Sequence, residues 1–267
     1  MTTPTGNPFA VVTGASSGIG YELAKQFAEH GYDLLIAAED SQIEQAAADL
    51  RRDGQNQVLP VRADLATYEG VEKLYAAIVE TGRPVDAIAL NAGRGIGGDF
   101  ATQTDLQDEL NVIDVNVTST VHLAKRVLPD MIARDAGDVL FTSSIASMMP
   151  GTYQAVYNAS KSFVQSFAEA LRNELKDTKV TITSLMPGPT DTQFFERADM
   201  MDTKVGQSSK DDPAVVAKQG FEALMKGKEK VVAGSTKTKV QGAASKVMPD
   251  AAKAQMHRKM AEPGGAE

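Results

Sequence analysis

Short apolar runs alternate with amphipathic stretches along most of this chain. The first run, at residues 9–12, leads into a glycine-rich segment, after which Leu23, Ala24 and Phe27 repeat with the spacing of one helix face. Such a run is typical of a buried strand, and such a spacing is typical of the helix that covers it. The same alternation predicts strands at 32–37, 57–62, 85–90, 138–142, 180–186 and 231–234, and helices at 43–52, 70–80, 106–134 and 156–171.

This alternation of strands and helices predicts a single doubly wound α/β domain of the Rossmann type. Alternating elements form a parallel sheet through right-handed crossovers, with helices on both faces. We expect about seven strands, a domain at residues 1–234 and a C-terminal extension at 235–267 that is not a separate domain. Ligands of such sheets bind at the carboxyl ends of the strands, so the residues that follow each strand are the first candidates for a site.

Composition and charge exclude several other classes of protein. A formal net charge of −8 argues against a general nucleic-acid binder. The chain has no cysteine, and its three histidines (His30, His122 and His257) lie far apart, which argues against disulfides, a metal site and a Ser-His-Asp triad. Residues 1–6 hold no leader pattern, and no stretch has the length of a membrane span. We therefore expect a cytoplasmic protein without a membrane segment.

The turn after the first strand is a candidate phosphate site. It contains Gly14, Gly18 and Gly20, with a strand before it and a helix after it. A turn of this kind lets the backbone approach a pyrophosphate and directs the N–H groups of the helix toward it. A tight turn that binds no ligand is the alternative.

Acidic residues after the second strand bear on the choice of cofactor. Glu39 and Asp40 follow Ala38 about twenty residues beyond the glycines, where a carboxylate would hydrogen-bond an adenosine ribose and repel a 2′-phosphate. Neither this junction nor the glycine turn contains Arg or Lys. The pattern favours NAD(H) and leaves NADP(H) open. Alternatively, both carboxylates are solvated and cap the helix that begins near Ser41.

Tyr157 and Lys161 form a candidate proton-transfer pair. Residues four apart on a helix share a face, so the ammonium can lie near the phenol and favour its ionised form. Ser144 follows the fifth strand and would hydrogen-bond the same substrate oxygen. By itself, a tyrosine four residues before a lysine is more typical of a surface pair.

The predicted helix at 106–134 contains two unusual residues. Asn116 lies among apolar positions, which suggests either a satisfied core amide or a local distortion that holds a water. Pro129 should kink the helix.

Together these motifs resemble the short-chain dehydrogenase/reductase family over roughly residues 8–234. The matching motifs are Thr13-Gly14-x3-Gly18-Ile19-Gly20, Asp64-Leu65, Asn91-Ala92-Gly93, Asn116, Ser144, Tyr157-x3-Lys161 and Pro187-Gly188 with Thr192. The resemblance implies an oxidoreductase that moves a hydride between a nicotinamide cofactor and a carbonyl or secondary alcohol.

The resemblance also implies roles for the matching residues. Tyr157 is the expected general acid/base, Ser144 polarises the carbonyl, Lys161 binds the nicotinamide ribose and lowers the pKa of Tyr157, and Asn116 holds a relay water. The expected cofactor contacts are Gly14, Ser16, Ser17, Gly18, Ile19, Gly20, Glu39, Asp64, Leu65, Asn91, Ala92, Gly93, Tyr157, Lys161, Pro187, Gly188, Thr190 and Thr192. No metal is expected, since Ser144 and Tyr157 can stabilise an alkoxide.

Two late segments depart from the regular pattern. Residues 193–212 lie where the family places a mobile substrate lid. The apolar side chains Phe194, Phe195, Met200 and Met201 suit contact with a lipophilic ketone or alcohol; alternatively, they bury the lid against the core.

Residues 226–261 hold nine Lys/Arg and two acidic residues, a charge of +7 that leaves −15 for the rest of the chain. We expect this tail to be a solvated helix that packs locally, with docking on a subunit or an anionic membrane as alternatives.

The leading hypothesis is an NAD(P)-dependent alcohol dehydrogenase or carbonyl reductase that acts on a small molecule. A lyase or epimerase of the same family, and a non-catalytic dinucleotide sensor, are the alternatives. By resemblance we expect a homodimer or homotetramer that assembles through the helices bearing Asn116 and Tyr157.

Overall fold

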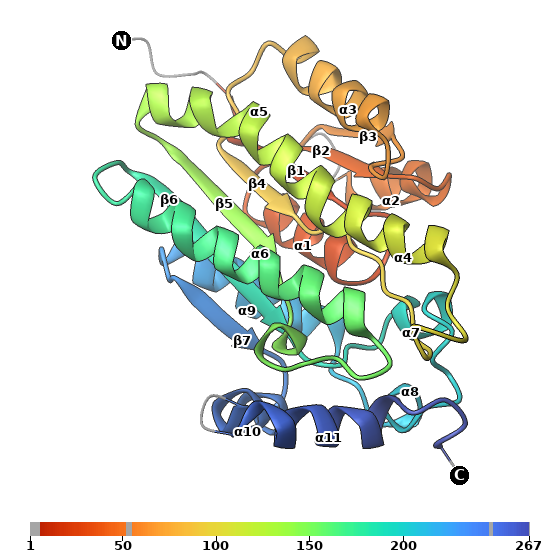
Figure 1. Cartoon of the computed structure of the whole chain (residues 1–267). Helices are drawn as coiled ribbons and strands as arrows, with labels where there is room; N and C mark the ends of the chain where they lie inside the picture. Colours follow the sequence, from red (N-terminus) through yellow and green to blue (C-terminus); the bar gives the residue numbers. More distant parts are fainter. Residues whose placement is uncertain (1–5, 52–54, 246–247, 267) are drawn as a thin grey trace.

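A seven-stranded parallel sheet forms the centre of the computed structural model, which describes residues 6–51, 55–245 and 248–266 (Figure 1). Its strand order is β3-β2-β1-β4-β5-β6-β7. The strands are β1 (Phe9–Thr13), β2 (Asp33–Ala38), β3 (Val58–Arg62), β4 (Ala87–Leu90), β5 (Gly137–Thr142), β6 (Val180–Pro187) and β7 (Lys230–Ala233). The order reverses between β1 and β4, so the predicted doubly wound sheet is confirmed.

Helices connect the strands and cover both faces of the sheet. They are α1 (Gly18–Glu29), α2 (Gln42–Leu50), α3 (Tyr68–Glu80), α4 (Leu106–Ile113), the π-helical turn η1 (Asp114–Thr118), α5 (Ser119–Arg134), the 3-10 turn η2 (Ile145–Met148), α6 (Ala155–Glu174), α7 (Phe194–Arg197), α8 (Lys204–Gln207), α9 (Pro213–Met225), α10 (Thr236–Ser245) and α11 (Asp250–Ala261). Residues 1–5 and Arg52, the expected end of the helix at 43–52, lie outside the described residues.

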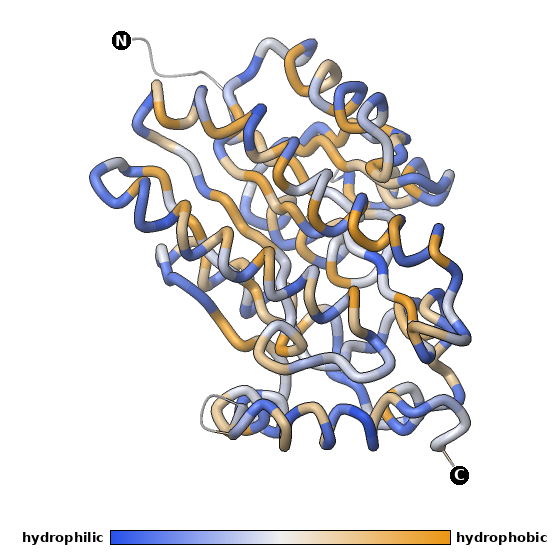
Figure 2. The backbone as a smooth tube through the Cα atoms, viewed as in Figure 1, coloured by the Kyte–Doolittle hydropathy of each residue, from blue (hydrophilic) through white to orange (hydrophobic). Residues whose placement is uncertain are grey.

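The core consists of two apolar layers, one on each face of the sheet. One layer includes Leu23 of α1, Ile43 of α2 and Phe221 of α9, whereas the other includes Leu74 of α3 and Leu123 of α5. All residues of β1, β2 and β4 are buried, and the strands form the hydrophobic interior visible in Figure 2. Parallel strands covered on both faces need such continuous apolar runs. The first polar residues after these strands therefore emerge together at one edge.

The helical segment predicted at 106–134 contains a π-helical turn. The turn, η1, separates α4 from α5 and has Asn116 at its centre. One extra residue per turn is accommodated there, which is the local distortion that an asparagine among apolar residues suggested. Pro129 lies inside α5, which continues to Arg134. A kink at Pro129 stays a prediction.

The C-terminal extension folds back onto the domain. Helix α10 contacts β7 and η2, and α11 lies beside α8 (Figure 1). His257 and Ala261 are buried in this packing, so α11 packs on the domain through these two side chains while most of its other residues are exposed or partly exposed. Among the described residues, no helix is both long enough and apolar enough to cross a bilayer.

Candidate active site

The glycine turn between β1 and α1 leaves its backbone open to a large cavity. Gly14 has a φ of +65°, and a Cβ there would lie 2.9 Å from the Cα atom of Ala92. A Cβ at Gly20 would collide with the carbonyl oxygen of Gly14, so α1 packs directly on the turn. Ser17 makes no side-chain cap, and the first turn of α1 has no acidic residue. The free N–H groups of α1 therefore fit a pyrophosphate.

Asn91 joins the ends of three neighbouring strands. Its Nδ2 donates a hydrogen bond to the carbonyl oxygen of Thr13 in β1 at 3.1 Å, and its Oδ1 accepts one from Thr142 Oγ1 in β5 at 3.0 Å. Thr13 Oγ1 in turn accepts hydrogen bonds from the N–H groups of Asn91 and Ala92. This network fixes the floor of the cavity and holds Gly93 against the Lys161 ammonium.

The two carboxylates after β2 have different surroundings. Asp40 accepts a hydrogen bond from Ser16 Oγ at 2.9 Å and another from the N–H of Gln42 at the start of α2, so it caps that helix. Glu39 is exposed, lines the cavity, and offers a carboxylate to which no described residue is hydrogen-bonded. Arg197 of α7 lies 4.0 Å from Asp40. Arg62 of β3 donates a hydrogen bond from Nε to the main-chain oxygen of Glu39 at 2.9 Å. The structure thus brings two guanidinium groups to a junction that is purely acidic in sequence.

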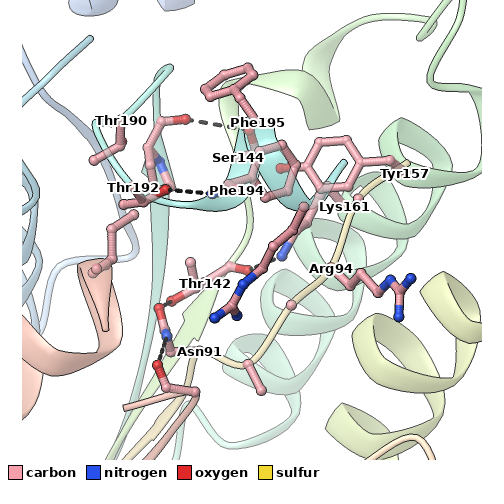
Figure 3. Close-up of a pocket in the computed structure, with 18 of the residues that line it drawn as sticks. Asn91, Arg94, Thr142, Ser144, Tyr157, Lys161, Thr190, Thr192, Phe194 and Phe195 are labelled. Carbon is pink, nitrogen blue, oxygen red and sulfur yellow. Dashed lines mark hydrogen bonds between the residues drawn. The ribbon is translucent and has the colours of Figure 1, made fainter. Parts of the chain in front are cut away.

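Ser144, Tyr157 and Lys161 meet at the centre of the cavity (Figure 3). Tyr157 lies in the first turn of α6, and Lys161 follows one turn later. The Lys161 ammonium is 5.9 Å from the centre of the Tyr157 ring and donates a hydrogen bond to the carbonyl oxygen of Thr142 at 3.0 Å. Ser144 is buried at the end of β5, where its Oγ accepts a hydrogen bond from the N–H of Ala146.

Burial shifts the proton affinities of this cluster. It raises the pKa of Tyr157 to about 12, whereas the nearby Ser144 hydroxyl acts in the opposite direction. Burial also lowers the pKa of Lys161 to about 8. Lys161 is not among the groups that shift the pKa of Tyr157 here, and its ammonium is hydrogen-bonded to Thr142, so the expected lowering by Lys161 stays a prediction. Tyr157 is therefore a protonated phenol at neutral pH, able to donate.

Asn116 lies behind this cluster with a fully engaged amide. Its Oδ1 accepts a hydrogen bond from the N–H of Arg94 at 2.8 Å, and its Nδ2 donates to Arg94 O and to Ser160 Oγ, both at 2.9 Å. The side chain satisfies a core polar site, while η1 supplies the distortion. The main-chain oxygen of Asn116 accepts a hydrogen bond from Thr120.

Nearly all the expected site residues converge on one cavity of about 650 Å³. It is lined by Gly14, Ser16, Ser17, Gly18, Ile19, Gly20, Glu39, Asp64, Leu65, Asn91, Ala92, Gly93, Ser144, Tyr157, Lys161, Pro187, Gly188, Thr190 and Thr192. Of the expected residues, Asn116 alone does not line it. Within the described ranges, no cluster of three His, Asp or Glu residues could hold a metal ion.

Comparison with known proteins agrees with this geometry. Residues 8–202 match the family model described as short chain dehydrogenase. The chain belongs to this family. It is therefore an oxidoreductase that uses NAD(P), in agreement with the glycine turn and the strand order described above.

Several relatives of this short-chain dehydrogenase are identified by name. It is 31% identical over 178 residues to the NADP-dependent 3-hydroxy acid dehydrogenase YdfG of Salmonella typhi, a match covering 67% of this chain and 71% of that protein. The corresponding enzyme of Schizosaccharomyces pombe is 30% identical over 69% of this chain and 72% of its own. A Staphylococcus epidermidis relative, 28% identical over 78% and 88%, is described only as an uncharacterized oxidoreductase.

Solved structures of the family include complexes with both forms of the cofactor. A Sphingobium yanoikuyae short-chain dehydrogenase in complex with NADPH superimposes with a TM-score of 0.77 at 26% identity, covering 84% of this chain and 87% of that one. A Burkholderia phymatum member in complex with NAD gives the same TM-score and identity, with coverage of 86% and 90%.

The cavity of this dehydrogenase also has lining residues that the sequence did not reveal. They come from four separate segments and include Arg94, Gln154, Arg197, His257 and Met260. Gln154 lies three positions before Tyr157, so its place beside a candidate catalytic residue could have identified it as a cavity residue. Arg197 and His257 carried none, because both reach the cavity through tertiary packing of elements far from the strand ends.

Proposed function

We propose that this short-chain dehydrogenase is an alcohol dehydrogenase or carbonyl reductase with Tyr157 as its general acid/base. The observation that supports it most is that Ser144 and Tyr157 lie together in a cavity that also reaches the glycine turn. Two hydroxyl donors at one point suit a carbonyl oxygen that gains negative charge during the reaction.

The cofactor is expected to span the cavity from the glycine turn to Tyr157. The turn would hold the pyrophosphate, Asp64 and Leu65 would flank the adenine, and Pro187, Gly188, Thr190 and Thr192 would border the nicotinamide. When bound, the nicotinamide supplies or accepts a hydride at the substrate carbon. The chain itself binds, orients and moves a proton at the substrate oxygen.

Proton transfer is the step that we assign to the side chains. The raised pKa keeps a proton on Tyr157 at neutral pH, so the phenol can donate it to the oxygen of a ketone. Ser144 donates a hydrogen bond to the same oxygen and holds it in line with the phenol. Lys161 would bind the nicotinamide ribose. The relay water at Asn116 stays a prediction, since its amide and main-chain oxygen already have hydrogen-bond partners.

We propose NAD(H) as the preferred cofactor because Glu39 offers an unengaged carboxylate beside the ribose position. NADP(H) is the competing choice, and a specific observation favours it: Arg197 lines the same part of the cavity and could meet a 2′-phosphate. The Salmonella typhi and Schizosaccharomyces pombe relatives are described as NADP-dependent. Glu39 and Arg197 are thus the two residues on which cofactor choice turns.

The substrate is proposed to be a small ketone or alcohol with a lipophilic body. Phe194 packs against Tyr157 with ring centres 5.1 Å apart, and Met149, Phe195, Val205 and Met260 continue the apolar wall. Residues 193–212 would act as the lid over this wall. A location in the cytoplasm stays a prediction.

A homodimer or homotetramer is proposed from an exposed apolar face on α4 and α6. Leu106, Ile113 and Phe163 are 70%, 38% and 43% exposed there, beside Phe100 at 57%. Such a patch is larger than isolated surface residues explain. Size-exclusion chromatography with light scattering checks the assembly, and a monomer at micromolar concentration would contradict it.

Turnover by the purified protein tests the proposed activity. NADH and NADPH are each mixed with a panel of ketones, and the absorbance at the reduced nicotinamide band is followed. Steady oxidation of either cofactor that depends on a ketone is expected. Cofactor binding with no absorbance change for any ketone or alcohol would instead indicate a sensor. Conversion of a hydroxylated substrate without net cofactor turnover would indicate a lyase or epimerase.

A further inference from the structure

Two polar side chains in the substrate end of the cavity keep hydrogen-bonding groups unused. Gln154 is 7% exposed and lines the cavity, and its Nε2 is buried without a partner among the described residues. No described residue is hydrogen-bonded to its Oε1 either, so the amide offers a donor and an acceptor whichever way it is turned. Nε2 is shielded as well as unpaired, so a turn of the amide that presents Nε2 to a ligand oxygen would recover the free energy that an unpaired buried donor costs.

The second side chain is His257 of α11, in the C-terminal extension. Its Nδ1 lies 2.8 Å from the carbonyl oxygen of Thr152, which can only accept, so Nδ1 carries the proton. Burial lowers the pKa of His257 and keeps the ring neutral. No described residue is hydrogen-bonded to its Nε2, which is then an unpaired acceptor on a side chain that lines the cavity.

Contacts between α11 and the loop before α6 hold these two groups in the same part of the cavity. Thr152 Oγ1 donates to the carbonyl oxygen of Ala254 at 3.1 Å, in addition to the His257 contact. Arg258 lies over the Tyr153 ring at 5.2 Å. Tyr153 itself has a φ of +65°, a strained conformation that this packing supports. Gln154 follows directly after this clamped segment.

The charge of the surroundings narrows the class of ligand. His257 is neutral, and the nearby Arg94 guanidinium is engaged by Asp108 and Asn111 at 3.1 Å each. Arg258, which lies over Tyr153, does not line the cavity. A carboxylate would therefore find no unpaired cation in His257, Arg94 or Arg258 within the cavity, whereas a hydroxyl can accept from Gln154 and donate to His257.

We propose that Gln154 and His257 form a recognition subsite for a neutral hydroxyl group on the carbonyl substrate, which makes hydroxyketones, and the matching diols, the preferred class. This inference rests on the proposed carbonyl reductase activity. The apolar wall of Phe194 and Met260 holds the carbon chain between the reacting carbonyl and this second oxygen.

The test compares matched ketones with and without a hydroxyl. Straight-chain methyl ketones of about four to eight carbons are each paired with the terminally hydroxylated counterpart. For at least one chain length, kcat/KM for the hydroxyketone should exceed that for the plain ketone by about tenfold, the discrimination expected of one good hydrogen-bonded site. Equal values at every length would overturn the proposal.

Three variants separate recognition from mere support of the fold. Gln154→Met removes the amide at constant size. His257→Asn keeps a hydrogen-bond donor at the position of Nδ1, which can still bond to Thr152, and loses the acceptor at Nε2. His257→Gln keeps a polar group at the position of Nε2 and loses the hydrogen bond to Thr152. Gln154→Met and His257→Asn should each cut the hydroxyketone preference about fivefold to tenfold, through KM, with the plain ketone changed less than about twofold. His257→Gln should retain part of the preference.

A result in which all three variants slow both ketones equally would assign these residues a structural role and overturn the subsite. Binding measured by calorimetry on Tyr157→Phe with NADPH bound separates the subsite from the proposed activity. Tighter binding of the hydroxyketone in a protein whose wild type turns over no ketone would sustain the subsite and reject the reductase. Equal binding would reject the subsite.

Discussion

The cofactor end and the substrate end of the cavity are built in different ways. At the cofactor end, Asn91 ties β1, β4 and β5 together by main-chain and side-chain hydrogen bonds at the ends of fully buried strands. At the substrate end, the walls are side chains from the 3-10 turn η2, the short helices α7 and α8, and α11. The first end inherits its geometry from the sheet, whereas the second depends on packing between surface segments.

This difference separates the chemistry of the enzyme from its selectivity. Tyr157 and Lys161 lie where the two ends meet, on α6, which packs against β5 and β6. A change in the sheet-anchored half should therefore alter the cofactor or the rate. A change in the segment-built half should alter which molecule is accepted.

Removing the Tyr157 hydroxyl should give the largest effect. In Tyr157→Phe, kcat should fall by about 10²- to 10⁴-fold, because a positioned general acid contributes a factor of this size. The dissociation constants of NADH and NADPH should change less than about twofold, since only the hydroxyl is lost. Stopped-flow turnover and fluorescence titration measure the two quantities, and wild-type kcat would exclude Tyr157 as the acid.

The next effect is a pH dependence centred on Lys161. Burial lowers the pKa of this lysine to about 8, so the ammonium predominates below that pH and the neutral amine above it. If the charge supports ribose binding and the proton relay, kcat/KM for ketone reduction should fall as the pH rises through about 8. Initial rates between pH 6 and 10 check this.

Lys161→Met provides the control for that profile. This variant should be slower by about 10- to 100-fold at pH 7 and should lack the step near pH 8. The same step in the variant would assign it to another group. A flat wild-type profile over the whole range would remove the ammonium from the mechanism.

The smallest effect should be confined to the cofactor end. Glu39→Arg should raise the affinity for NADPH relative to NADH by about tenfold, or about 1.4 kcal/mol, because a guanidinium replaces a carboxylate beside the ribose. Glu44→Arg makes the same charge change on the exposed side of α2 and serves as the matched control. An equal shift in both variants would attribute the change in cofactor preference to the net charge of the protein. An unchanged preference in Glu39→Arg would indicate that Glu39 is a solvated residue without contact to the ribose.

The sheet and the cofactor end could be predicted because their signals are local. Parallel strands end at the same edge of the sheet. The residues that follow them, such as Asp64 and Asn91, therefore lie together at that edge regardless of the conformation of the loops. The glycine spacing at Gly14 and Gly20 reflects close backbone approaches that no other residue tolerates. Once the order of the strands is known, these local features are enough to predict the position of the cofactor site.

The substrate end could not be predicted because its signals are distant. His257 comes about a hundred residues after Thr152, the residue that orients its ring, and nothing in an Ala- and Lys-rich stretch indicates which helix face is buried. Arg197 presents the same problem, since a short helix carries it to Asp40. The hydrogen bond from Lys161 to Thr142 was also missed, because spacing places Lys161 on the right face but does not say that Thr142 receives its ammonium.

The attachment of α11 to a loop, through Thr152 and Tyr153, has an evolutionary consequence. A helix held this way can exchange its inward side chains without disturbing strand register or the glycine turn. Substitutions in α11 can then change the range of substrates while the nicotinamide cofactor and the hydride transfer stay the same. Among related dehydrogenases, the sequence should diverge fastest in the C-terminal helix that closes the cavity and slowest at the strand ends that form its floor.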